Sequence, residues 1–160
     1  MLYDIIRSKG AQEVVVKGAP LRDRSTRTRM VESAVALLRE HSSAGVTIDA
    51  VLAHSGAPRG SVYHHFPGGR DELVAEAVLL AGRHVGRQIE QAAAAGATPA
   101  DVVADFVDFW QRMLRRTDYL AGCPVVALAV DTRPEADSQV SLVAAVFSDW
   151  HEPPTQVLVL

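Results

Sequence analysis

A polar segment between residues 58 and 70 carries the side chains of this sequence that are best suited to binding nucleic acid. Arg59, Ser61 and His64 follow one another closely, and Arg70 comes soon after them. A guanidinium can donate two parallel hydrogen bonds to guanine, and a serine hydroxyl is short enough to reach a phosphate or a base edge. These residue types are chemically suited to contact with DNA, provided that the fold presents them on one surface.

Catalytic and metal chemistry find little support in the sequence. It contains no nucleophile elbow, no phosphate-binding Walker loop and no Cys/His pair at catalytic spacing. The single cysteine, Cys123, has no second Cys or His at zinc spacing, so we interpret it as a small buried hydrophobe. His64 and His65 lack an acidic or Cys partner at helical spacing and can equally be surface residues without a ligand. We expect no enzyme, no cofactor and no metal site.

Charge is divided unevenly along the 160 residues, whose net charge is −3. Residues 1–70 hold ten Lys/Arg against six Asp/Glu, a net charge of +4, whereas the remainder holds six against thirteen, a net charge of −7. A basic front and an acidic back suit a protein that turns one end toward phosphates and keeps the other away.

Composition and chain start favour a globular protein of the cytoplasm. Apolar residues make up 48% of the chain and charged residues 22%, so the chain can bury a core. The longest apolar stretches, Val125–Val130 and Val143–Val146, are far shorter than the roughly 20 residues that a membrane span needs. Asp4, Arg7 and Lys9 occupy the place where a secretory signal would carry its apolar core.

The front of the chain predicts three helices that position the polar segment. Apolar residues at helical spacing predict a helix over about 26–41, with Ser25 or Thr26 as its cap. Thr47 caps a second, short helix that stops near Ser55–Gly56. Pro58 begins a third helix that runs to about His65, since proline at a first helical position loses no hydrogen bond.

The rest of the chain predicts a helical body. A long helix runs from Arg70 to about Ala94, and the run 98–101 caps another that ends at about Thr117. The apolar side of the helix that ends at about Thr117 covers close to half its circumference, so we expect this helix to be largely buried. A short apolar segment reaches Val130. Pro134 opens a last helix, which Pro153–Pro154 ends. Nothing alternates as a strand would, so the fold class is all-α.

Residues 47–73, TIDAVLAHSGAPRGSVYHHFPGGRDEL, resemble the signature segment of the TetR family of transcriptional regulators. The specific match covers about 26–73, and a looser helical match extends to about 150. The run Phe66–Gly69 followed by a basic residue, together with Gly122–Val125, is similar to the subgroup typified by the lincomycin-resistance repressor. Two short helices joined by a tight glycine-containing turn also have the architecture of helix-turn-helix readers of the major groove.

The resemblance implies a domain organisation and a function. It implies an extension at 1–21, a three-helix DNA-binding domain at 22–69, a regulatory body at 70–152 and a tail at 153–160. Family members bind double-stranded DNA as homodimers, usually repress transcription, and release DNA when a small ligand binds. We expect a ligand-responsive repressor with a small apolar effector.

Position in the motif assigns the DNA-contacting residues. Val62 should face inward against the helix at 47–55, which leaves Arg59, Ser61 and His64 for the groove. The resemblance implies that the Tyr63 hydroxyl reaches a phosphate while its ring packs beneath the helix, and that Arg70 holds a phosphate. The expected DNA-binding set is Arg27, Thr47, Pro58, Arg59, Gly60, Ser61, Tyr63, His64 and Arg70. Arg22, Arg24, Arg27 and Arg29 either wrap a neighbouring phosphate or minor groove or are simply solvated.

The body offers a weaker expectation about the effector. Phe106, Phe109, Trp110 and Met113 either line an apolar ligand pocket, as the matching helix does in the family, or form ordinary core.

Two departures from the family qualify these expectations. Pro58 stands where the family commonly has serine, so one hydroxyl contact is missing. The chain also ends before the last two helices, which build the family's dimer, and this predicts an exposed apolar stripe over residues 143–150. The alternative function is therefore a truncated relic, or an interaction-only partner of a full-length relative.

Overall fold

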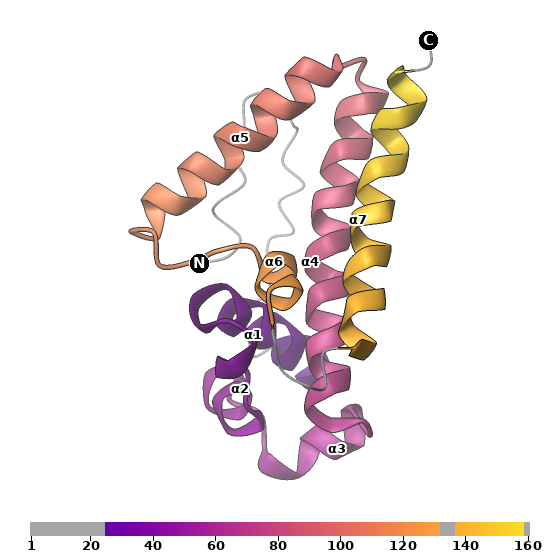
Figure 1. Cartoon of the computed structure of the whole chain (residues 1–160). Coiled ribbons are helices and arrows are strands. Elements are labelled where there is room, and N and C mark those ends of the chain that lie inside the picture. The colour runs from indigo at the N-terminus through magenta and orange to yellow at the C-terminus, as the bar shows by residue number, and fades with distance from the viewer. Residues whose placement is uncertain (1–24, 132–136, 159–160) are drawn as a thin grey trace.

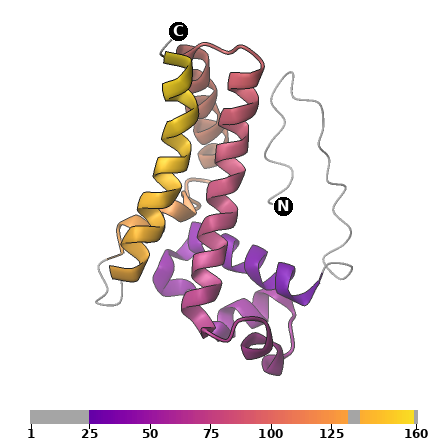
Figure 2. The ribbon, with the colours of Figure 1, turned by 90° about the vertical axis from the view of Figure 1, so that its right-hand side faces the viewer.

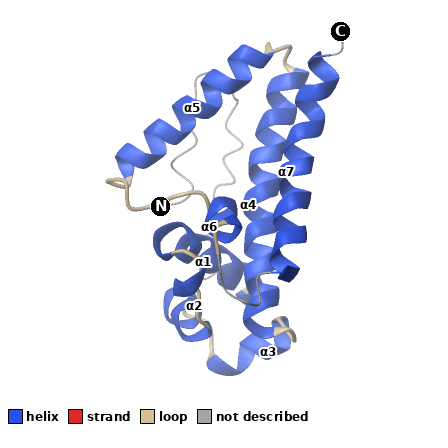
Figure 3. Cartoon of the chain, in the orientation of Figure 1, coloured by secondary structure: helices blue, strands red, loops and turns tan. Residues whose placement is uncertain are grey.

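The computed structural model describes residues 25–131 and 137–158 as helices joined by short loops (Figure 1). Within these residues there are seven α-helices and two 3-10 turns. No strand occurs among the described residues (Figure 3). The expected all-α fold is thereby confirmed. The predictions for the extension at 1–21, for Arg22 and Arg24, and for Pro134 concern residues outside the described ranges.

The front of the chain folds as the local signals predict. Its elements are α1 (Thr26–His41), η3 (Ser43–Gly45), α2 (Ile48–Ser55), η4 (Arg59–Ser61) and α3 (Val62–His65). The Ser25 hydroxyl accepts a hydrogen bond from the Thr28 N–H at 3.2 Å and caps α1. Gly56 ends α2 because it adopts φ +65°, a left-handed conformation that side chains disfavour.

The third helix begins one residue later than predicted, and its first turn is a 3-10 turn instead of α-helix. Pro58 is extended, with ψ 144°, and stands just before η4 instead of inside a helix. Its carbonyl accepts hydrogen bonds from the Ser61 N–H at 3.0 Å and from the Ser61 hydroxyl at 2.6 Å. These bonds close a tight 3-10 turn, so regular α-helix begins only at Val62.

One apolar core joins the front of the chain to the first half of α4 (Gly69–Ala94). Phe66, Leu38, Val51 and Val62 are all completely or almost completely buried, and α4 contributes four residues with no exposed surface, namely Leu73, Val74, Ala77 and Val78. Because α3 has a single turn of α-helix, this burial and not its own hydrogen bonding holds it in place.

The body consists of α5 (Pro99–Arg116), α6 (Pro124–Ala129), α7 (Asp137–Leu158) and the second half of α4. Helices α4 and α7 run side by side in the same direction in both views (Figures 1 and 2). They approach closely at Gly82, against which Val146 packs, and the Trp150 indole N–H donates to the Gly82 carbonyl at 2.8 Å. Helix α6 fills the space among α1, α4 and α7.

Two expectations about the last helix are wrong. Helix α7 continues through Pro153–Pro154 to Leu158. Proline removes one donor but fixes φ near a helical value, so it can be accommodated inside a helix at a cost. Val143 and Val146 are 8% and 3% exposed because they pack against the core that includes α4, so the predicted exposed stripe is confined to Phe147, which is 42% exposed.

The burial predicted for α5 is also wrong. Val103 and Phe106 are 62% and 43% exposed, and Met113 is the one buried residue of this helix. Periodicity identifies the apolar face of a helix, but another element must lie against that face to bury it. Here α5 slants away from α4 and α7 over most of its length (Figure 1). Its start is as predicted, because Thr98 and Asp101 form a reciprocal capping box.

The contact between α4 and α7 generates a paired prediction. A Cβ at Gly82 would lie 2.6 Å from Val146 Cγ1, so Gly82→Ala forces the helices apart and should destabilise the protein by about 1–3 kcal/mol. A Cβ at Gly86 meets Trp150 Cδ1 at an ordinary 3.6 Å, so Gly86→Ala should stabilise by up to about 1 kcal/mol through helix propensity. Urea unfolding measures both changes. If both substitutions changed the free energy of unfolding in the same direction, the packing argument would be contradicted.

Candidate nucleic-acid interface

The η4–α3 segment is fixed from within and polar on its outer side. Val62 and Phe66 have no exposed surface and anchor the segment to α1, α2 and α4. The Arg59 side chain is 88% exposed, Tyr63 is 68% exposed, and His64 is exposed as well. The inward position predicted for Val62 is thus observed. An outward face of this kind presents donors to a partner from a rigid base.

Arg59 is held only loosely in the structure. One guanidinium nitrogen lies 3.5 Å from an Asp49 carboxylate oxygen, and both side chains are more than three-quarters exposed. Ion pairs between exposed side chains contribute little because water screens them. The guanidinium can therefore leave Asp49 for a stronger acceptor at small cost.

Tyr63 differs from the expectation in one respect. Its ring does not pack beneath the helix, since it is 68% exposed, whereas Phe66, three residues later, has no exposed surface. The space around Gly60 is open, and a Cβ there would meet no atom within 4 Å. The outer face of this turn is therefore unobstructed.

Three smaller members of the expected set have defined local roles. The Thr47 hydroxyl oxygen accepts from the Ala50 N–H at 3.1 Å and caps α2, which leaves its own O–H able to donate to a second partner. The Ser61 hydroxyl donates to the Pro58 carbonyl at 2.6 Å, so its proton is directed into the turn. Pro58 supplies that carbonyl.

Two arginines of the expected set are engaged inside the protein. Arg27 pairs with Glu76 of α4, and its guanidinium carbon lies 5.1 Å above the centre of the Phe66 ring. Arg70 is only 23% exposed, and its Nε donates to the Val46 carbonyl at 2.7 Å. A second nitrogen of Arg70 donates to the Ser43 carbonyl. Sequence reasoning missed these roles because the acceptors are remote in the chain, and backbone carbonyls leave no signature in the sequence.

The aromatic residues predicted to line a ligand pocket lie together on α5. Trp110 contacts Phe106 and Phe109 edge-on, with ring centres 6.1 and 5.4 Å apart. A hollow of about 210 Å³ lies elsewhere, between α6 and α7, and none of the four predicted residues lines it. Its lining consists of Leu128, Ala129, Asp131, Val140, Val143 and Ala144.

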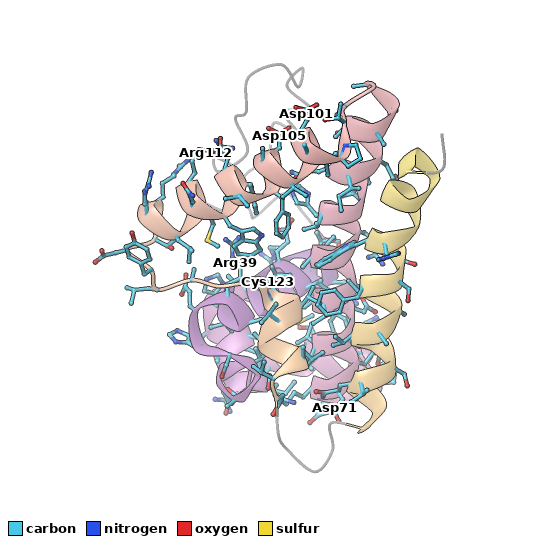
Figure 4. All side chains as sticks on the ribbon, turned by 45° about the horizontal axis from the view of Figure 1, so that its top comes forward. Arg39, Asp71, Asp101, Asp105, Arg112 and Cys123 are labelled. Carbon is cyan, nitrogen blue, oxygen red and sulfur yellow. The ribbon has the colours of Figure 1, made fainter. Side chains whose placement is uncertain are left out.

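A group of ionisable side chains lies around Arg39 and includes Cys123 and His84. Figure 4 shows Arg39 beside Cys123, with Arg39 contributed by α1 and Cys123 standing at the start of α6. Burial lowers the pKa of Arg39, an effect that the neighbouring Cys123 and Glu40 partly oppose. Burial, followed by the positive charges of Arg87 and Arg39, lowers the pKa of His84. His84 is also in contact with Gln88, at 3.3 Å between side-chain nitrogens.

The described part of the chain contains neither a candidate metal-binding cluster nor a helix able to span a membrane. No group of three His, Cys, Asp or Glu side chains there is arranged to hold a metal ion. None of the helices described is long and apolar enough to cross a membrane.

Comparison with known proteins matches both halves of the chain. Residues 30–77 match the family described as bacterial regulatory proteins, tetR family, and residues 99–159 match the C-terminal domain of LmrA/YxaF-like transcriptional regulators. An HTH-type transcriptional regulator of Mycobacterium tuberculosis is 41% identical over 131 residues, covering 79% of this chain and 66% of that protein. LmrA of Bacillus subtilis, named an HTH-type transcriptional regulator, is 26% identical over 125 residues, covering 78% of this chain and 66% of LmrA. The chain thus spans about two thirds of the length of these relatives.

The hydroxyl cap of α2 should contribute measurably to the stability of the protein. Thr47→Ala removes the hydroxyl acceptor of the Ala50 N–H and should lower the free energy of unfolding by about 1 kcal/mol. Thr47→Ser keeps the hydroxyl and serves as the matched control. Urea unfolding of the two variants decides, and an alanine variant as stable as the serine variant would mean that water replaces the cap.

The environment of His84 generates a pH prediction. Its pKa is lower in the folded protein than its ordinary 6.5, so the unfolded chain takes up a proton first as the pH falls. Stability from this residue is complete above the ordinary value and is lost as the pH falls through the lowered one. Urea midpoints measured between about pH 5 and pH 8 should therefore fall less on acidification in His84→Gln than in the unmodified protein. Identical pH profiles would rule this contribution out.

Proposed function

The chain belongs to the TetR family of bacterial transcriptional regulators, and on that premise we propose that η4 and α3 enter the major groove of duplex DNA. The observation that carries the proposal is the outward face of residues 59–64, which is backed by the fully buried Val62 and Phe66. A recognition element needs exposed donors on a base that does not move, because each donor must meet its acceptor within a fraction of an ångström.

Arg59 supplies sequence recognition in this proposal. Its side chain is 88% exposed and gives up only a weak contact with Asp49 on binding. A guanidinium in the major groove donates two hydrogen bonds to O6 and N7 of guanine, a pattern that no other base pair presents. His64, on α3 directly after η4, is exposed and can donate to a base edge or a neighbouring phosphate.

Phosphate contacts around the recognition element fix its position on the duplex. Tyr63 is exposed enough for its hydroxyl to reach a phosphate, and the Thr47 hydroxyl can donate one while it still caps α2. Arg27 and Arg70 were expected to join them, but their contacts with Glu76 and with backbone carbonyls favour a positioning role.

The body gives the proposed function its regulatory part. Its sequence matches the C-terminal domain of LmrA/YxaF-like regulators, and α5 carries an exposed apolar face that includes Phe106. We place a small apolar effector against this face and Trp110. Homodimeric repression, with release of DNA when the effector binds, and a cytoplasmic location belong to the same proposal.

DNA binding tests the proposal directly. The purified chain is titrated against duplex DNA from upstream of its own gene and against random duplex, at several salt concentrations. Arg59→Ala should weaken binding to the specific duplex by roughly 5- to 150-fold and narrow its preference over random DNA. Arg112→Ala, which removes the same charge from exposed α5, is the control and should change little.

Two outcomes would contradict the assignment. If Arg59→Ala and Arg112→Ala weakened DNA binding equally, only the total charge of the protein would matter. If the unmodified chain bound the upstream duplex and the random duplex with the same affinity, it would not recognise a sequence.

A further inference from the structure

The turn that leads into α2 is held by one guanidinium. The turn comprises residues 42–47 and includes η3. Arg70 donates to the Ser43 carbonyl and, at 2.7 Å, to the Val46 carbonyl, so a single planar side chain binds both ends of the turn. The Ser43 carbonyl also accepts the Val46 N–H at 3.2 Å. Ser43 is 2% exposed and the Arg70 side chain 23% exposed, so these bonds to a charged group are partly shielded from water, which strengthens them.

The body holds the same turn from the other side. The Ser43 hydroxyl donates to a carboxylate oxygen of Asp131, which follows the C-terminal end of α6. Just before the other end of α6, the Gly122 N–H donates to the Arg39 carbonyl at 2.8 Å, near the end of α1. Val125 is 1% exposed and packs α6 into the common core. Helix α6 is therefore held by the core and by one hydrogen bond next to each of its ends.

This turn determines where α2 begins. The Thr47 N–H donates to the Gly45 carbonyl at 3.0 Å, and Thr47 is the cap of α2. Val46 has no exposed surface and packs in the same core as Val62 of α3. A displacement of Ser43 therefore moves Thr47 and the first turn of α2 relative to α3.

We propose that Asp131 is a positioning residue for DNA binding, which acts through Ser43 and, together with Arg70, holds α2 in its reading position. The inference rests on the proposed DNA-binding function and adds the residues that connect α6 of the body to it. It also assigns Arg70 to the turn instead of to a phosphate.

The sign of one substitution separates this role from simple electrostatics. Asp131→Ala removes a negative charge, and electrostatics alone predicts equal or tighter binding to DNA. A positioning role predicts weaker binding, because α2 loses part of its support. Asp105→Ala removes the same charge from an exposed site on α5 and is the matched control.

The experiment measures specific DNA binding and amide hydrogen exchange in the full chain. Asp131→Ala and Ser43→Ala should each weaken specific binding about tenfold or more, a loss of the size expected for one hydrogen bond to a charged group. The double variant should lose no more than the worse single variant, because both substitutions remove the same bond. Exchange of the amides of residues 46–50 should accelerate in both variants, with no change in α5.

The outcomes separate the inference from the function on which it rests. Binding by Asp131→Ala as tight as that of Asp105→Ala, or losses that add in the double variant, would overturn the inference. Ser43→Ala removes one oxygen and carries the test alone if Asp131→Ala does not fold. If the unmodified chain binds no duplex, the proposed function fails, and unaltered exchange at residues 46–50 would then overturn the positioning role as well.

Discussion

Burial of Phe66 is the constraint on which the recognition element depends. Helix α3 comprises four residues, too few for its own hydrogen bonds to keep it helical. Phe66 has no exposed surface and follows α3 directly, while Val62 is equally buried at its start. Burying such side chains contributes roughly 1.5–3 kcal/mol each. Because Val62 and Phe66 hold one side of this segment in the core, its polar side chains are directed to the solvent.

The arginines of the front half divide between the fold and the surface. Arg27 covers the Phe66 ring and pairs with α4, and Arg70 closes the turn before α2. Arg59 alone of these three has its side chain almost wholly in water. The excess of basic residues in the first half of the chain is therefore not all available on the contact surface. Arg27 and Arg70 hold the DNA-binding helices in place, and this arrangement presents Arg59 to a partner.

The body combines one tight contact with one loose one. Gly82 lets α4 and α7 approach closely enough for the Trp150 indole to reach a backbone carbonyl. Helix α5, by contrast, leaves Phe106 43% exposed. The rigid pair continues the core of the DNA-binding helices, since α4 belongs to both. Helices α4 and α6 therefore both connect the body to the front of the chain, α6 in part through the contact of Asp131 with Ser43.

The sequence by itself determined most features that depend on neighbours within about one helical turn, with the 3-10 turn after Pro58 and the continuation of α7 through Pro153–Pro154 as exceptions. The caps at Ser25, Thr47 and Thr98 and the stop at Gly56 are found where their residue types predict them, because their hydrogen bonds or backbone angles are local. The helix-turn-helix and the inward position of Val62 follow from the same short-range pattern.

Only the tertiary structure decided what lies against each face and which charges are already paired. Whether the apolar side of α5 is covered depends on helices far away in the chain, and the acceptors of Arg70 are carbonyls 24 and 27 residues earlier. Periodicity records which side of a helix is apolar but not what packs on it. A residue type records what a side chain can bind, whereas the fold determines which partner it finds.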